Sequence, residues 1–264
     1  MKWINSYLNI YTILFALAVL ILIIKGIFFV FKKRRPTIGN AQILGAVGVQ
    51  NDYFGTLETQ NGIIAVVSDG IGRSKLGRKC AEIVVNTFLA QFDKAGPIID
   101  HKQFLSRTLM LANQRVTKYT IDINCGATLS AVIICNNKAH WINIGNSCIM
   151  VASKEEIIRL SKTYTQLYIN EPTYKRKPQA YYDRYIGIED DLKAQNGHFD
   201  LDKTQRQVLL CTDGVYQQIS EMDMLKVLKS SRNAYDKAQE ILLQIARKKR
   251  SDQDNATLIV LDIC

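Results

Sequence analysis

The sequence predicts an α+β fold, a four-layer sandwich of two stacked, mainly antiparallel β-sheets flanked by helix pairs and preceded by one transmembrane helix. Two observations support this fold class. Strand and helix patterns come in blocks: strands, two helices, strands, two more helices and a closing strand, an order typical of layered α+β proteins. In addition, a long apolar stretch near the N-terminus stands apart from these blocks.

The N-terminal stretch, residues 8–31, is almost entirely apolar. As a helix it would be about 36 Å long, enough for a hydrocarbon core of about 30 Å. The basic cluster Lys32-Lys33-Arg34-Arg35 follows directly, and the positive-inside rule places that end in the cytoplasm. A cleaved signal peptide is the alternative, but the run is too long and the charge lies on the wrong side.

We therefore expect residues 1–35 to be a single-pass anchor in the cell membrane and residues 36–264 to be a cytoplasmic domain. The net charge is +10, but residues 1–35 hold six Lys or Arg and no acid, which leaves 28 basic against 24 acidic residues. This balance is too mild to indicate nucleic-acid binding, and none is expected. The basic cluster is instead typical of a segment that sets the orientation of a membrane helix and contacts lipid headgroups.

The first half of the domain combines strand and helix patterns. Strands are expected at 43–49, 53–57 and 62–68. Residues 77–92 and 104–119 carry apolar side chains at helical spacing along one face, which predicts two helices that cover a sheet.

Closely spaced β patterns follow the second helix. Strands are expected at 128–135, 139–144, 148–152, 156–160, 208–212 and 256–262, and helices at 220–228 and 233–249. The basic run 247–250 would close the last helix, where cations favour the helix dipole. Residues 162–206 are irregular and polar, and a long loop of this kind is usually functional or mobile.

Two of the apolar runs lead into the same dipeptide, Asp69-Gly70 and Asp213-Gly214, and Asp254 precedes the closing strand. Asp-Gly is the strongest short hairpin signal, so each dipeptide taken alone reads as a turn. Both, however, follow runs typical of buried strands, where an unpaired carboxylate is costly. A cation or several donors would be needed, and oxygen ligands favour Mg²⁺, Mn²⁺ or Ca²⁺.

Zinc is not expected from the sequence. The six cysteines show no paired C-x-x-C spacing, and the three histidines are scattered along the chain. Dispersed cysteines without a framework also suit a reducing compartment.

The order of short motifs over residues 40–264 resembles the metal-dependent protein phosphatases of the type 2C class, of a bacterial-like kind. The motifs are Val49-Gln50-Asn51-Asp52, Ser68-Asp69-Gly70-Ile71-Gly72, Gly126-Ala127-Thr128, Ile144-Gly145-Asn146-Ser147, Thr212-Asp213-Gly214-Val215 and Asp254-Asn255-Ala256-Thr257. Each motif is weak alone, whereas six in this order are specific. The resemblance implies the two-sheet sandwich that the block pattern predicts.

The resemblance also implies a site with two Mn²⁺ or Mg²⁺ ions that hydrolyses phosphoserine and phosphothreonine in proteins. Asp69 would bridge both ions, and the Gly70 carbonyl would ligate one of them directly or through water. Asp213 and Asp254 would hold the other ion, and Asp52 would be a ligand or a supporting acid. Two such cations activate a water and neutralise charge on the phosphoryl group. The implied catalytic set is therefore Asp52, Asp69, Asp213 and Asp254.

Two positions depart from the family pattern. Val47 stands where the family usually has a phosphate-clamping arginine, which should weaken phosphate capture. Asn146 stands where an acid helps to hold a third, weaker metal, so a third ion should bind poorly. Residues 162–206 match the variable flap beside the active site. A second functional class therefore stays open, a pseudophosphatase that binds phosphoproteins with little turnover. A cognate Ser/Thr kinase is a candidate partner in either class.

Overall fold

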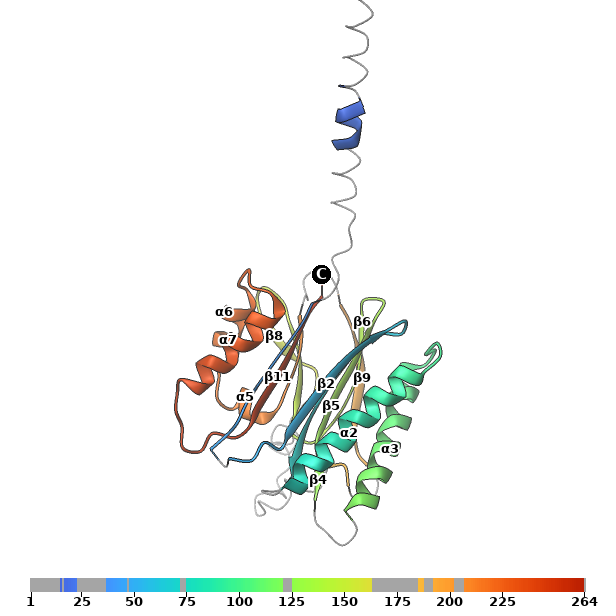
Figure 1. Cartoon of the computed structure of the whole chain (residues 1–264), viewed down its shortest axis with the longest axis vertical. Helices are drawn as coiled ribbons and strands as arrows, with labels where there is room; N and C mark the ends of the chain where they lie inside the picture. Colours follow the sequence, from blue (N-terminus) through green and yellow to red (C-terminus); the bar gives the residue numbers. More distant parts are fainter. Residues whose placement is uncertain are drawn as a thin grey trace, which may run out of the picture. The chain divides into compact units, whose positions relative to one another are not determined.

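The computed structural model describes residues 15, 17–22, 37–46, 48–71, 75–120, 125–162, 185–187, 192–201 and 207–263. Residues 36–263 form one compact unit, to which residues 1–35 do not belong. Within this compact unit, two β-sheets lie face to face between two layers of helices (Figure 1). The predicted sandwich of two antiparallel sheets and helix pairs is confirmed.

The first sheet has the strand order β1-β11-β10-β7-β8, and each neighbouring pair is antiparallel. Its strands are β1 (Thr37–Ile43), β7 (Cys148–Ala152), β8 (Ile157–Arg159), β10 (Gln207–Cys211) and β11 (Ala256–Asp262). Two helices, α6 (Glu221–Leu228) and α7 (Ala234–Ala246), cover its outer face (Figure 1). The N-caps Ser220 and Asn233 each accept the backbone N–H three residues on, which starts these helices.

The second sheet has the order β2-β3-β5-β6-β9, again with antiparallel neighbours, and β4 pairs with the end of β3. Its strands are β2 (Asp52–Thr59), β3 (Gly62–Ile71), β4 (Gly126–Ala127), β5 (Leu129–Cys135), β6 (Lys138–Ile144) and β9 (Gln195–Asp200). The helices α2 (Lys75–Lys94) and α3 (His101–Tyr119) cover its outer face.

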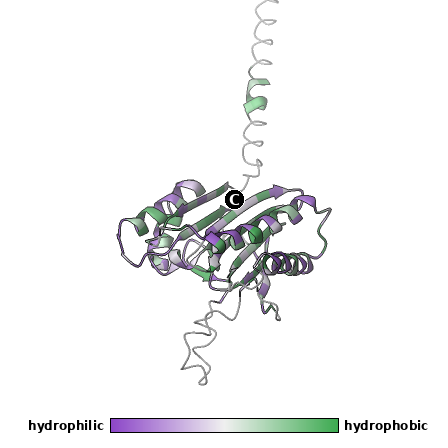
Figure 2. Cartoon of the chain, turned by 60° about the horizontal axis from the view of Figure 1, so that its bottom comes forward, coloured by the Kyte–Doolittle hydropathy of each residue, from purple (hydrophilic) through white to green (hydrophobic). Residues whose placement is uncertain are grey.

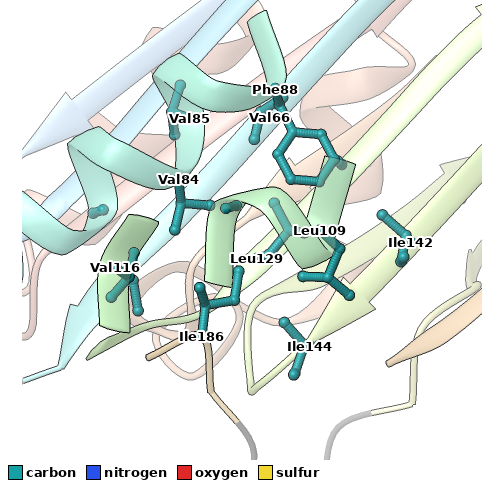
Figure 3. Packing of buried hydrophobic residues seen from close by; sticks show 14 of the residues in the cluster. Val66, Val84, Val85, Phe88, Leu109, Val116, Leu129, Ile142, Ile144 and Ile186 are labelled. Atoms are coloured by element: carbon teal, nitrogen blue, oxygen red, sulfur yellow. The ribbon is translucent and has the colours of Figure 1, made fainter. Parts of the chain in front are cut away.

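Apolar side chains from the two helices fill the space above the second sheet. Figure 3 shows Val84 and Phe88 of α2 and Leu109 of α3 directed toward β-strand residues such as Val66 and Ile142. A separate apolar layer joins the inner faces of the two sheets. Figure 2 shows the same division, with hydrophobic strands inside and more hydrophilic helix surfaces outside. The central strands thus bury both faces, whereas each helix buries one.

Three element predictions are wrong. The strand predicted at 43–49 lies instead at Thr37–Ile43, so that the two ranges share only Ile43. The region 162–206, predicted as irregular, contains the edge strand Gln195–Asp200. The last helix ends at Ala246, so the basic run 247–250 follows the helix rather than closing it. The short helix α5 (Asp213–Tyr216) was not predicted.

The predicted membrane segment, residues 8–31, lies mostly outside the described residues, which include only 15 and 17–22 of it, in helical conformation. Among the residues that the structure describes, no helix has both the length and the apolar content needed to cross a bilayer. Most of the predicted flap, including 163–184, also lies outside the described residues. Both predictions therefore remain predictions.

Candidate metal centre

The two sheets bring the four predicted acids together from distant parts of the chain. Asp52 begins β2 and lies directly opposite Asp69 on β3. Asp213 is the first residue of α5, just after β10, and Asp254 lies in the loop before β11. Because β10 and β11 are antiparallel neighbours, the end of β10 and the start of β11 lie together, and this second pair of acids follows there. Each sheet thus contributes two carboxylates.

Asp52 ties the two sheets to each other. Its side chain is buried, at 1% exposure, and its Oδ2 accepts hydrogen bonds from Thr212 Oγ1 (2.8 Å) and Thr257 Oγ1 (2.7 Å). Burial raises the pKa of Asp52 to about 6, although the bonds from the two threonines lower it. The carboxylate is therefore costly to ionise unless a positive charge approaches it.

Asp69 is held through its backbone. Its N–H donates to Thr128 Oγ1 (2.9 Å), and its carbonyl accepts the Thr128 N–H (2.8 Å). The Thr128 hydroxyl also shares a hydrogen bond with Ser147 Oγ at 2.7 Å. Burial raises the pKa of Asp69 well above its usual range, and repulsion from Asp52 and then Asp213 raises it further. Thr128 therefore positions the most strongly perturbed acid of the site.

Asp213 receives two amide donors. Asn146 Nδ2 donates to its Oδ2 at 2.8 Å, and Gln217 Nε2 donates to the same oxygen at 3.1 Å. Burial raises the pKa of Asp213 to about 7, helped by repulsion from Asp254 and then Asp52. Asp254 is exposed, and its Oδ1 accepts the backbone N–H of its neighbour Asn255 at 2.8 Å.

Neither Asp-Gly dipeptide is a hairpin turn, so the turn reading is wrong for both. Gly70 lies inside β3, which continues past Asp69 to Ile71 by pairing with β4. A Cβ on Gly70 would come 2.0 Å from the Gly77 carbonyl oxygen of α2. A Cβ on Gly214, in α5, would come 2.0 Å from the Asn255 carbonyl oxygen. These glycines permit close backbone contacts that bring the acids together.

Sequence reasoning assigned no role to three residues that organise the site. The hydroxyls of Thr128, Thr212 and Thr257 bond the backbone or side chain of its acids. Their positions in the sequence could have indicated this role. Thr128 lies in the Gly126-Ala127-Thr128 motif, Thr212 directly precedes Asp213, and Thr257 lies three residues after Asp254. Val47, the departure from the phosphate clamp, lies outside the described residues.

The chemistry of the donor set fits hard divalent cations. Within the described part of the chain, no Lys, Arg or His side chain forms an ion pair with the carboxylates of Asp52, Asp69 and Asp213, although Arg78 donates to the Asp52 backbone carbonyl. Oxygen-only donors of this kind suit Mn²⁺ or Mg²⁺. In the same described ranges, no three acidic, Cys or His side chains are grouped as ligands of a single ion. The argument for Mn²⁺ or Mg²⁺ therefore rests on the oxygen chemistry of the carboxylates.

The chain is similar to a known family over most of its length. The model of the family described as Protein phosphatase 2C matches residues 48–254, which include all four acids. The "Serine/threonine phosphatase stp" of Listeria monocytogenes serotype 4b is 21% identical over 227 residues, covering 80% of this chain and 89% of that protein.

Solved structures show the same fold. The S. agalactiae serine/threonine phosphatase superposes with a TM-score of 0.77 at 17% identity, covering 87% of this chain and 100% of that chain. The Mycobacterium tuberculosis serine/threonine phosphatase PstP/Ppp gives a TM-score of 0.72 at 19% identity, covering 86% and 98%. A structure of the PstP catalytic domain in complex with two manganese ions gives 0.71 at 19% identity, covering 86% and 99%.

Proposed function

Because the chain belongs to the protein phosphatase 2C family, a family of metal-dependent phosphoprotein phosphatases, we propose that it hydrolyses phosphoserine and phosphothreonine monoesters in proteins. The reaction would use two Mn²⁺ or Mg²⁺ ions. The observation that carries this proposal is the convergence of Asp52, Asp69 and Asp213, whose pKa values are raised and whose carboxylates form no ion pair among the described residues.

The proposed roles follow from position. Asp69 would hold both ions, and the Gly70 carbonyl would ligate one of them directly or through water. Asp213 and Asp254 would hold the other ion, and Asp52 would be a ligand or a supporting acid. Bound divalent ions of this kind supply a nucleophilic water at neutral pH and neutralise charge on the phosphoryl group. The protein contributes a fixed arrangement, since the hydrogen bonds from threonine and asparagine described above hold the carboxylates in place before any ion binds.

The test is phosphate release from a phosphothreonine peptide by the purified full-length protein in detergent, with and without Mn²⁺. We expect Mn²⁺-dependent turnover that falls by more than about 100-fold in Asp69→Asn and in Asp213→Asn, because each removes a ligand charge. Asp93→Asn is the matched control, since Asp93 is exposed near the end of α2. Unchanged turnover in Asp69→Asn or Asp213→Asn would overturn the metal mechanism.

A second candidate is a pseudophosphatase that binds a phosphoprotein with little turnover. The observation that favours it is the Asn146 amide, which donates to Asp213 where the family pattern has an acid. Val47 in place of an arginine supports the same candidate from the sequence. Stoichiometric Mn²⁺ binding without phosphate release, together with turnover restored by Val47→Arg, would select this candidate over the phosphatase.

We also propose that residues 8–31 anchor the protein in the cell membrane as a single-pass helix, with the phosphatase domain in the cytoplasm. The support is the apolar run and the basic cluster at residues 32–35. Reporter fusions at residue 40 test the orientation, and alkaline phosphatase activity there would reverse it. A cognate Ser/Thr kinase whose substrates are dephosphorylated by this enzyme is the proposed partner.

A further inference from the structure

The three histidines of the chain, scattered in sequence, lie together in the structure. His101, His140 and His198 are the only histidines in 264 residues. The rings of His101 and His140 stack with centroids 4.2 Å apart and planes 10° apart. The His140 and His198 centroids are 6.2 Å apart. The histidines are therefore scattered only along the sequence, and this argument against zinc does not hold for the folded chain.

The fold explains this convergence. His140 and His198 are directly opposite each other in the β6–β9 pairing, so their side chains project from the same face of the sheet. Ile142 and Ile144 share that face of β6 and pack in the core beneath α2 and α3. His101 is the first residue of α3, after the N-cap Asp100. The cluster thus lies where the start of α3 meets the edge of the sheet (Figure 1).

We propose that His101, His140 and His198 form a second metal site, which takes a borderline transition-metal ion such as Zn²⁺. Imidazole nitrogen is a preferred zinc ligand, whereas Mg²⁺ prefers oxygen. Two imidazoles on one tetrahedral zinc ion have ring centroids about 5 Å apart, given a Zn–N bond of about 2 Å. The observed separations of 4.2 Å and 6.2 Å lie on either side of that value.

Binding requires the imidazole rings to rotate out of the stack. The lone pairs of imidazole lie in the ring plane, so two parallel stacked rings cannot direct them at one ion, and the described residues contain no group already set as ligands. His101 is only partly buried and at a helix start, and His198 is exposed, so both rings have room to turn. Burial lowers the pKa of His101 and of His140, which favours the neutral form that binds metal.

The site is separate from the carboxylate centre. β6 ends at Ile144, shortly before Asn146, whose amide donates to Asp213. His140 lies four residues before Ile144 on this strand, which corresponds to about 13 Å. The charged neighbours of the cluster are Lys138 and Asp200, which form an exposed ion pair at 3.3 Å, and the N-cap Asp100. A bound ion would link the start of α3 to the β6–β9 edge, and would therefore stabilise the fold rather than take part in phosphate release.

The experiment uses the full-length protein in detergent with about 1,000-fold excess Mn²⁺ over Zn²⁺, because Zn²⁺ binds more tightly than Mn²⁺ and a large excess is needed to keep the carboxylate site filled. Equilibrium dialysis against Zn²⁺ should give one ion per chain, with at least about tenfold weaker binding in His140→Ala, His101→Gln and His198→Gln. Asn196→Ala is the matched control, because Asn196 is exposed on the same face of β9, two residues from His198. The control should bind like the native chain.

A second readout covers variants that fold poorly. With only three histidines, the chain gives three imidazole Hε1 signals in a ¹H–¹³C spectrum, and one equivalent of Zn²⁺ should shift all three in the native protein. Zn²⁺ binding that is unchanged in His140→Ala, or that shifts fewer than two of the three signals, would overturn the site. Neither readout depends on phosphatase activity, so failure of one proposal leaves the other untouched.

Discussion

Removing the charge of Asp52 should stabilise the metal-free protein at neutral pH, although Asp52 belongs to the proposed active site. Its carboxylate is buried, and its pKa rises from 3.8 to about 6 in the folded chain. A folded-state pKa above the unfolded value means that ionisation favours unfolding. The stability contributed by the protonated group is complete below about pH 4 and is lost as the pH rises through 6.

The size of the effect follows from the shift. A rise from 3.8 to about 6 corresponds to about 3 kcal/mol of stability lost on full ionisation. Asp52→Asn keeps an oxygen that can accept the bonds of Thr212 and Thr257 and removes only the charge. At pH 8 in EDTA, the variant should therefore be more stable by up to about 3 kcal/mol, or about 6–12 °C in Tm.

The assay is urea unfolding of the full-length protein in detergent and EDTA at pH 4, 6 and 8. The native chain and Asp52→Asn should coincide at pH 4 and separate as the pH rises, with Asp93→Asn as the exposed control. In saturating Mn²⁺ the order should reverse, because the native carboxylate then faces a cation. A variant that is no more stable at pH 8, or equally more stable at pH 4, would refute the reasoning.

Three further variants probe the site. Gly214→Ala should lower stability and Mn²⁺ affinity together, as a Cβ there would lie 2.0 Å from the Asn255 carbonyl; unaltered thermal unfolding and Mn²⁺ titration would contradict this. Asn146→Ala removes a 2.8 Å donor to Asp213 and should weaken Mn²⁺ affinity about 10-fold in calorimetry, with an unchanged constant as the contrary result. Thr128→Val leaves a buried N–H without its acceptor and should cost about 1–3 kcal/mol in urea unfolding, a loss that Thr128→Ser should largely avoid.

Elements with strong periodicity were predictable from the sequence. The two helices over the second sheet and the strands β5, β6, β7 and β11 match their predicted ranges within a few residues, because their apolar side chains pack into hydrophobic clusters on one or both of their faces. β1 was missed because Gly39 interrupts it. A Cβ at Gly39 would come 2.1 Å from the backbone of Ala234 in α7, so the residue that weakens the strand signal is required by helix packing.

The edge strand β9 was missed for a different reason. Its six residues include Gly197 and several polar side chains, and every second residue is exposed, so it resembles a loop in composition. A strand of this kind is defined by its hydrogen bonds to β6 rather than by its own side chains. The meeting of His140 with His198 depends on that register, and no feature of the sequence alone specifies it.

The acids of the candidate site were predictable from the sequence. The contacts that bury them, and so make their ionised forms unfavourable, were not. The sequence placed acids beside buried strands, whereas the structure shows that one carboxylate, Asp52, accepts hydrogen bonds from Thr212 and Thr257 of the opposite sheet. Asn51 and Asn255 are joined beside it, by a 2.9 Å bond between the Asn51 N–H and Asn255 Oδ1. Asp52 therefore belongs both to the contact between the two sheets and to the candidate metal site. A bound cation would offset the repulsion among the acids at the point where the sheets are joined. Metal binding would therefore stabilise this end of the sandwich, because a ligand that binds only the folded chain raises the stability of the fold.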